Sequence, residues 1–71
     1  MITVSSTNIR SIDYDRAKHE LTVIFLARPR ERYVYYNVLP KIWVKFVQSE
    51  SKGQFFADRI KNEYSYRILK Q

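Results

Sequence analysis

The sequence predicts an α+β domain in which a three-stranded antiparallel meander is followed by two helices packed on one face of the sheet. The first half carries short runs of β-branched and aromatic residues separated by polar connections, the pattern of strands. From Pro40 onward the apolar residues recur at helical spacing. A length of 71 residues allows one small domain, so residues 1–71 are expected to form a single unit.

Three strands are expected, over residues 8–14, 21–26 and 32–36. Within the first, Ile9 and Ile12 break strict alternation, which a β-bulge would explain. The third follows an expected turn, Arg28-Pro29-Arg30-Glu31. Both connections are too short for a parallel crossover, which needs a dozen residues or more, so the strands should be antiparallel neighbours.

The first helix is expected to begin at Pro40, because the missing N–H of proline costs nothing in a first helical turn. One face of this segment is apolar and the opposite face polar. The apolar face carries Ile42, Trp43, Phe46 and Val47, and the polar face carries Lys41, Lys45 and Gln48.

A second helix is predicted after Ser51. Ser51 and Gln54 have the spacing of a capping box, in which the hydroxyl accepts from the N3 amide and the glutamine reaches back. Its apolar stripe consists of Phe56, Ile60 and Tyr64. The tail, residues 64–69, alternates enough for a short strand but could also continue the helix, and the sequence does not decide between the two.

Composition excludes several function classes. The chain has no cysteine and one histidine, which rules out disulfides and thiolate sites and argues against multi-His metal sites. Asp13 and Asp15 lie where a strand enters a turn, and His19 lies among polar residues, so turn and surface roles are expected for them. No catalytic constellation is present, and neither enzymatic activity nor a cofactor or metal is expected.

Membrane insertion is not expected either. The longest apolar stretch, residues 21–27, is far below the roughly 20 residues that span a bilayer. The first residues lack the basic and apolar regions of a signal peptide. A cytoplasmic location is therefore expected.

The centre of the chain combines basic and aromatic residues. Its arginines are Arg28, Arg30 and Arg32, and its tyrosines are Tyr33, Tyr35 and Tyr36. Guanidinium groups bind phosphate in bidentate fashion, and exposed rings stack on unpaired bases. By strand alternation Tyr33 and Tyr35 share one face and are expected in the core, leaving Tyr36 outside. A solvated hairpin tip feeding a half-buried strand is the alternative interpretation.

The helical half is also basic. Residues 37–71 hold seven Lys and Arg against three Asp and Glu, or 7 − 3 = +4 of the total of +6. Such a surplus favours salt-dependent attraction to polyanions, although charged helix faces are more often merely solvated. Ser51-Lys52-Gly53 at a helix start could favour an anion, but helix capping with a close backbone approach is the better explanation.

In order along the chain, several segments resemble the KTSC domain, a family named for its place at the C-terminus of some lysyl-tRNA synthetases. The matching segments are Ser5-Ser6-Thr7-Asn8-Ile9, Tyr14-Asp15, Leu21 to Phe25, Tyr33-Val34-Tyr35, Val38-Leu39-Pro40, Ser51-Lys52-Gly53 with Phe55-Phe56, and Ile60 with Tyr64. The sequence departs from the family at Asp13, where glycine is usual, and at residues 27–32, where an Arg-rich segment replaces a Gly-bearing turn. The resemblance implies a standalone bacterial or phage-type protein and a suggested role in RNA binding.

Together these observations predict a non-enzymatic nucleic-acid-binding module, with RNA ahead of DNA. The residues expected to bind are Arg28, Arg30, Arg32, Tyr36, Lys41, Lys45, Lys52 and Arg59. The rival hypothesis is a protein-interaction module, an adaptor or phage-encoded inhibitor, that uses the basic surface against an acidic host protein or pairs through an edge strand. Either a monomer or a homodimer is compatible with the sequence. One contiguous basic face with Tyr36 exposed would support nucleic acid, whereas dispersed charge would weaken it.

Overall fold

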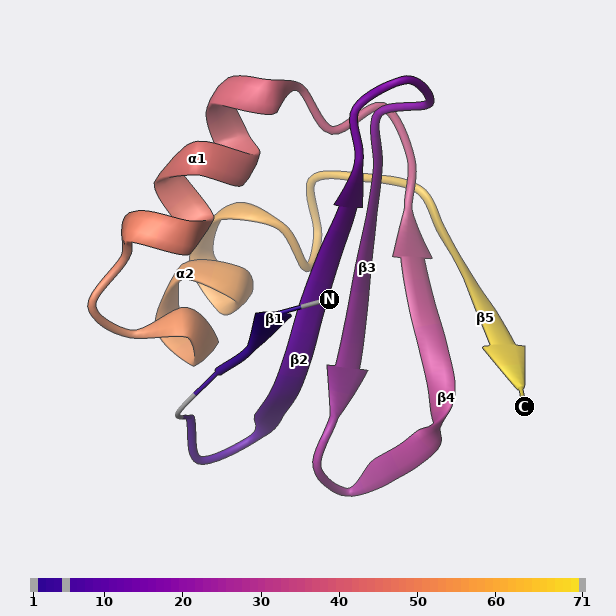
Figure 1. Cartoon of the computed structure of the whole chain (residues 1–71), viewed down its shortest axis with the longest axis vertical. Coiled ribbons are helices and arrows are strands. Elements are labelled where there is room, and N and C mark those ends of the chain that lie inside the picture. Colours follow the sequence, from indigo (N-terminus) through magenta and orange to yellow (C-terminus); the bar gives the residue numbers. More distant parts are fainter. Residues whose placement is uncertain (1, 5, 71) are drawn as a thin grey trace.

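The computed structural model describes residues 2–4 and 6–70 and shows an α+β fold, as predicted (Figure 1). Within these residues one antiparallel sheet has the strand order β1-β2-β3-β4-β5, and two helices follow β4 in the chain. The elements are β1 (Ile2–Thr3), β2 (Ile9–Asp15), β3 (Glu20–Phe25), β4 (Arg28–Tyr35), α1 (Pro40–Gln48), α2 (Lys52–Arg59) and β5 (Tyr66–Lys70).

The sheet has five strands, so the prediction of three was wrong in number. The strand β1 is two residues long, too short to show a periodic pattern. The tail forms β5, which settles the choice between strand and helix in favour of strand. β5 lies against β4 with Tyr66 opposite Tyr35 and Ile68 opposite Tyr33, at the edge of the sheet.

The Arg-rich segment is not the turn that the sequence predicts. The turn consists of Leu26 and Ala27, and β4 already begins at Arg28. Proline has no N–H to donate to a ladder, and Pro29 lies where the β3–β4 register shifts, between Phe25 opposite Arg28 and Val23 opposite Tyr33. The irregular pairing lets β4 hold Pro29 near its start, whereas the Arg-Pro-Arg-Glu sequence alone indicates a turn.

The predicted bulge in the first strand is confirmed. The β2–β3 register shifts between Ile9 and Ser11. Because of this shift, Ile9 and Ile12 are both fully buried although three positions separate them. The meander of β2, β3 and β4 is likewise antiparallel throughout.

Both helices begin where predicted, but the capping box is only half formed. Pro40 lies in the first turn of α1. At the start of α2 the Ser51 hydroxyl accepts a hydrogen bond from the Gln54 N–H at 3.2 Å. The Gln54 amide donates forward to the Asp58 carboxylate at 3.0 Å instead of returning to Ser51. One member of the predicted reciprocal pair is therefore absent.

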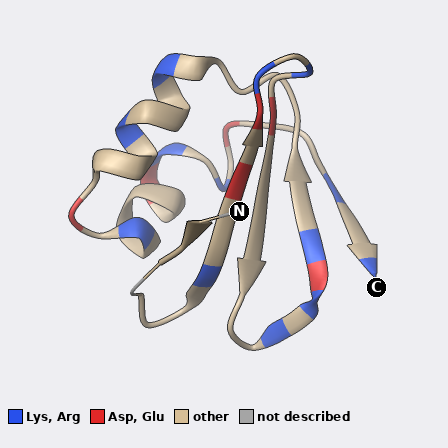
Figure 2. Cartoon of the chain, in the orientation of Figure 1, with Lys and Arg blue, Asp and Glu red and all other residues tan. Residues whose placement is uncertain are grey.

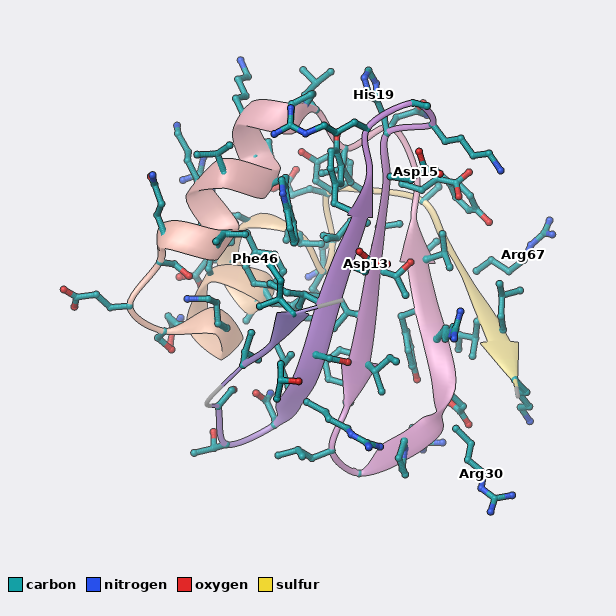
Figure 3. All side chains as sticks on the ribbon, in the orientation of Figure 1. Asp13, Asp15, His19, Arg30, Phe46 and Arg67 are labelled. Carbon is teal, nitrogen blue, oxygen red and sulfur yellow. The ribbon has the colours of Figure 1, made fainter. Side chains whose placement is uncertain are left out.

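The core lies between the helices and the sheet. Phe46 points from α1 toward the sheet and is fully buried (Figure 3). Trp43 of the same helix stacks on Tyr14 of β2 with ring centroids 5.4 Å apart, and the Tyr14 hydroxyl donates to the Val38 carbonyl. The helices and β5 lie on opposite sides of the view in Figure 1. β5 consequently stays exposed along its length.

Candidate functional site

A groove of about 580 Å³ opens between α2 and the part of the sheet formed by the end of β3, β4 and β5. Aromatic side chains line it, and we call it the aromatic groove. Its rings are Phe25, Tyr33, Tyr35, Phe56 and Tyr66; its other lining residues are Thr7, Asn8, Leu26, Ala27, Arg28, Gly53, Ala57, Lys61 and Asn62.

Strand register places the three tyrosines of the groove together. Tyr33 and Tyr35 alternate onto the face of β4 that the helices partly cover. Tyr66 lies directly opposite Tyr35 in β5 and so projects from the same face. The alternation of two adjacent strands is thus sufficient to build the aromatic wall.

The rings form a continuous set of contacts. Tyr66 stacks against Tyr33 with centroids 6.0 Å apart and planes 21° apart, and its ring is 5.2 Å from that of Tyr35. Phe25 and Phe56 meet edge to face at 5.2 Å, and each also contacts one tyrosine. Tyr35 is buried, but Tyr66 is 51% exposed. Tyr66 is therefore partly exposed to solvent, while its ring packs against those of Tyr33 and Tyr35.

The rim of the groove is polar and carries two cations. The Arg28 guanidinium lies 3.5 Å from the Glu31 carboxylate and its side chain is 62% exposed. Glu31 also accepts a hydrogen bond from the Tyr33 hydroxyl at 3.4 Å. Lys61 and Asn62 follow α2 in the chain and are exposed. The groove thus combines stacking surface with positive charge and amide groups.

Burial, together with the smaller effect of the neighbouring Tyr66 and Tyr33 phenols, raises the pKa of Tyr35 to about 12. Tyr35 is therefore a neutral phenol at physiological pH. Its role in the groove is that of a packed ring supporting Tyr66, since a proton held this tightly is not exchanged in acid–base chemistry near pH 7.

The three arginines of the predicted site do not share one surface. Arg28 lies on the rim of the aromatic groove. Arg32 is exposed and lies opposite Leu69, on the other face of the sheet from Tyr33. Arg30 is exposed and points away from the body of the domain (Figure 3).

Among the tyrosines, the structure favours a different ring from the one predicted for stacking. Tyr36 is half-buried beyond the end of β4, and its N–H donates to the Ser65 carbonyl at 3.0 Å. Tyr35 is in the core, as predicted, whereas Tyr33 is only half-buried and lines the groove. Tyr66 and Lys61 were not among the predicted site residues. The alternation of the tail was the signal available for Tyr66.

The predicted cations of the helical half have separate surroundings. Lys41 and Lys45 are exposed on α1. The Lys52 ammonium donates to the Ser49 carbonyl, just past the end of α1, and the Arg59 guanidinium lies 5.7 Å from the centroid of the Phe55 ring. Figure 2 shows basic residues on the helices, on the β2–β3 turn and on β4 and β5, so the Lys and Arg positions are spread over several elements.

A second, more polar pocket of about 450 Å³ adjoins the aromatic groove and shares Thr7, Asn8 and Gly53 with it. A Cβ atom at Gly53 would lie 2.7 Å from the Asn8 side-chain oxygen. Ser51 caps α2. Because Gly53 has no Cβ atom, the Asn8 side chain can lie close to the backbone of the helix. The Ser51-Lys52-Gly53 segment therefore performs the capping and close packing that the sequence favoured.

The aspartates have local roles in the structure. The Asp15 carboxylate accepts from the backbone N–H groups of Ala17 and Lys18, at 3.0 and 3.1 Å, which is the turn chemistry predicted for it.

In the described part of the chain, no three His, Asp or Glu side chains are grouped so as to hold a metal ion. No helix among residues 2–4 and 6–70 is long and apolar enough to cross a membrane.

Comparison with known proteins identifies the family. The model of the KTSC domain matches residues 5–64. The crystal structure of a KTSC domain protein from Yersinia pestis is similar, with a TM-score of 0.87, 34% sequence identity, and coverage of 94% of this chain and 92% of that one. A search of curated proteins gives no match. The chain belongs to the KTSC domain family.

Proposed function

We propose that this protein is a non-enzymatic module that binds single-stranded nucleic acid, RNA in preference to DNA, in the aromatic groove. The observation that carries the proposal is the half-exposed Tyr66 ring, which packs against Tyr33 and Tyr35 in a groove that the cations Arg28 and Lys61 also line. Every nucleobase has a face that stacks on such a ring, and each stacked base contributes about 1–3 kcal/mol.

The groove favours unpaired bases over a duplex. Bases in a duplex already stack on each other and present only their edges, so a recessed aromatic surface cannot reach their faces. Arg28 and Lys61 would contact the phosphates on either side of a base on Tyr66. Thr7, Asn8 and Asn62 supply hydroxyl and amide groups within the same groove for base edges or the ribose 2′-hydroxyl.

Because the positive charge is dispersed, we expect the main nucleic-acid contacts to lie in this groove and along its rim. The sequence-based proposal spread phosphate contacts over both helices and β4. Among the predicted cations, Arg28 lines the groove. Lys52 binds the Ser49 carbonyl and Arg59 lies against the Phe55 ring, and neither lines the groove. Lys41, Lys45, Arg30 and Arg32 remain candidates for weaker, salt-dependent contacts outside it.

The test is the affinity of a fluorescently labelled 12-nucleotide oligouridylate, measured by anisotropy at low salt. Replacing Tyr66 with Ala removes the stacking surface, so affinity should fall roughly 10- to 100-fold, within the range of one lost base–aromatic stack. Tyr66→Phe is the matched control, because it keeps the ring and should bind within about twofold of the parent protein.

Three results would contradict the proposal. They are no detectable binding of the oligouridylate at low salt, equal affinity for Tyr66→Ala and the parent protein, and preference for a duplex of the same length. Tyr36→Ala tests the ring favoured by the sequence. A loss confined to that variant would move the site to the end of β4.

A further inference from the structure

The strand β5 forms an open edge of the sheet with apolar side chains on it. All five of its residues are exposed, and β4 is its neighbour in the strand order. Ile68 and Leu69 keep 40% and 44% of their surfaces in solvent. Unpaired edge strands offer a ready template for another strand, and proteins that avoid such pairing shorten or bury them.

The ladder shows which backbone groups of β5 face outward. The Tyr36 N–H donates to the Ser65 carbonyl, and these two residues form the next pair of the same register beyond Tyr35–Tyr66. In an antiparallel ladder hydrogen-bonded and non-hydrogen-bonded pairs alternate. The N–H and C=O groups of Ser65, Arg67 and Leu69 therefore face β4, and those of Tyr66, Ile68 and Lys70 face the open edge.

The two faces of β5 differ in chemistry. Tyr66 and Ile68 project on the side of the aromatic groove, since they lie opposite Tyr35 and Tyr33. Arg67 projects from the other face and away from the domain (Figure 3). Lys70 lies opposite Glu31, the carboxylate that also pairs with Arg28. A strand added at this edge would meet Tyr66, Ile68 and Lys70 on one face, and Arg67 and Leu69 on the other.

We propose that the β5 edge binds an extended acidic segment of a partner protein by strand addition. The segment alternates apolar residues, facing Tyr66 and Ile68, with Asp or Glu facing Arg67, and its backbone pairs with Tyr66, Ile68 and Lys70. Opposite charges on adjacent positions of paired strands are stabilising. The site shares the Tyr66 side chain with the aromatic groove, but its backbone contacts are its own, and it does not depend on nucleic-acid binding.

Charge selects an acidic partner over a second copy of this chain. Each chain carries a net charge of +6, with Arg67 and Lys70 on the edge itself. Edge-to-edge pairing of two copies would bring these cations together, which like-charge repulsion opposes. An acidic segment meets the same edge with attraction.

The experiment is an amide NMR titration of the full chain with an eight-residue capped peptide of alternating Glu and Val. The largest shift changes are expected at the Tyr66, Ile68 and Lys70 amides, together with slower hydrogen exchange there. Ile68→Pro removes an outward N–H without removing a β4 ladder bond, and should weaken binding at least tenfold. Ile68→Thr keeps that N–H and is the matched control.

A second pair of variants keeps the test valid if the proline variant does not fold. Arg67→Glu with Lys70→Glu should abolish binding of the Glu-Val peptide and favour a Lys-Val peptide. Lys41→Glu with Lys45→Glu makes the same change in net charge on α1 and should retain most of the affinity.

The proposal is overturned by binding that Ile68→Pro leaves unchanged in a folded protein, or by equal loss in the α1 and β5 charge variants. It is also overturned if oligouridylate perturbs the outward amides and the Glu-Val peptide does not, or if the chain is a dimer through β5 in solution.

Discussion

Tyr35 connects the core with the groove at the level of a single side chain. Its ring is 3% exposed, meets Phe56 edge to face at 5.5 Å, and lies 5.2 Å from Tyr66. Burial disfavours the phenolate, which is why the pKa of Tyr35 rises to about 12. The same burial makes folding sensitive to alkaline pH.

Stability should fall between pH 10 and pH 12, because the unfolded chain releases the Tyr35 proton near its ordinary pKa of 10.0 and the folded chain retains it to about 12. The unfolded state then binds fewer protons, and the Tyr35 contribution decreases by up to about 1.4 kcal/mol per pH unit. Tyr35→Phe should lose less stability over this range. Urea unfolding at pH 9 and pH 11 measures how much unfolding free energy each protein loses. An equal loss in the parent protein and in Tyr35→Phe would contradict the raised pKa of Tyr35.

Gly53 lies in close contact with one side chain, that of Asn8. Alanine is normally the better residue in a helix, by about 0.5–1 kcal/mol. At Gly53, however, the added methyl would lie 2.7 Å from the Asn8 oxygen, so that gain should be absent or reversed. In an Asn8→Ala background the gain should return. A double-mutant cycle should therefore give a coupling of at least about 0.5 kcal/mol, and a coupling of zero would contradict this packing.

At the scale of elements, the start of α2 depends on a single hydroxyl. Ser51 accepts from the Gln54 N–H, and Gln54 does not return the contact. Ser51→Ala should therefore cost about 1 kcal/mol of unfolding free energy, and Ser51→Asp should retain most of it. Thermal and urea unfolding measure both. A loss from Gln54→Ala that equals the loss from Ser51→Ala would indicate that the reciprocal box forms in solution.

The elements that the sequence predicted well are those with a repeated pattern. β2, β3 and the helices show apolar periodicity or a capping signal, and Ile9 with Ile12 indicated the bulge. The edge strands were harder to predict for physical reasons. β1 is too short to have a period, and every residue of β5 is exposed, so no buried face distinguishes strand from helix there.

The error at β4 had direct consequences for the candidate site. Because Arg28, Pro29 and Arg30 resemble a turn, the three arginines were expected together at a hairpin tip. As strand residues in an irregular register they point to different sides, with Arg28 at the groove and Arg32 on the opposite face. The groove itself depends on Tyr66 meeting Tyr33 and Tyr35 across strands, a pairing that sequence periodicity alone does not specify.

For the whole molecule, the net charge and the positions of the charged residues lead to different expectations about binding. A surplus of +6 favours any polyanion, but Figure 2 shows it spread over several elements. We therefore expect the proposed nucleic-acid binding to depend on the aromatic groove and its rim rather than on a broad basic face. We expect Arg28 and Lys61, and not the lysines of α1, to supply most of the charge that contacts the phosphates.

The most direct test of that claim is the salt dependence of oligouridylate affinity in three proteins. For single strands, log K falls with log salt by about 0.7 per neutralised phosphate, so Arg28→Ala with Lys61→Ala should make the slope shallower by roughly 1.4. Lys41→Ala with Lys45→Ala removes the same charge from α1 and should leave the slope nearly unchanged. A slope that the groove pair leaves intact while the α1 pair reduces it would contradict the account.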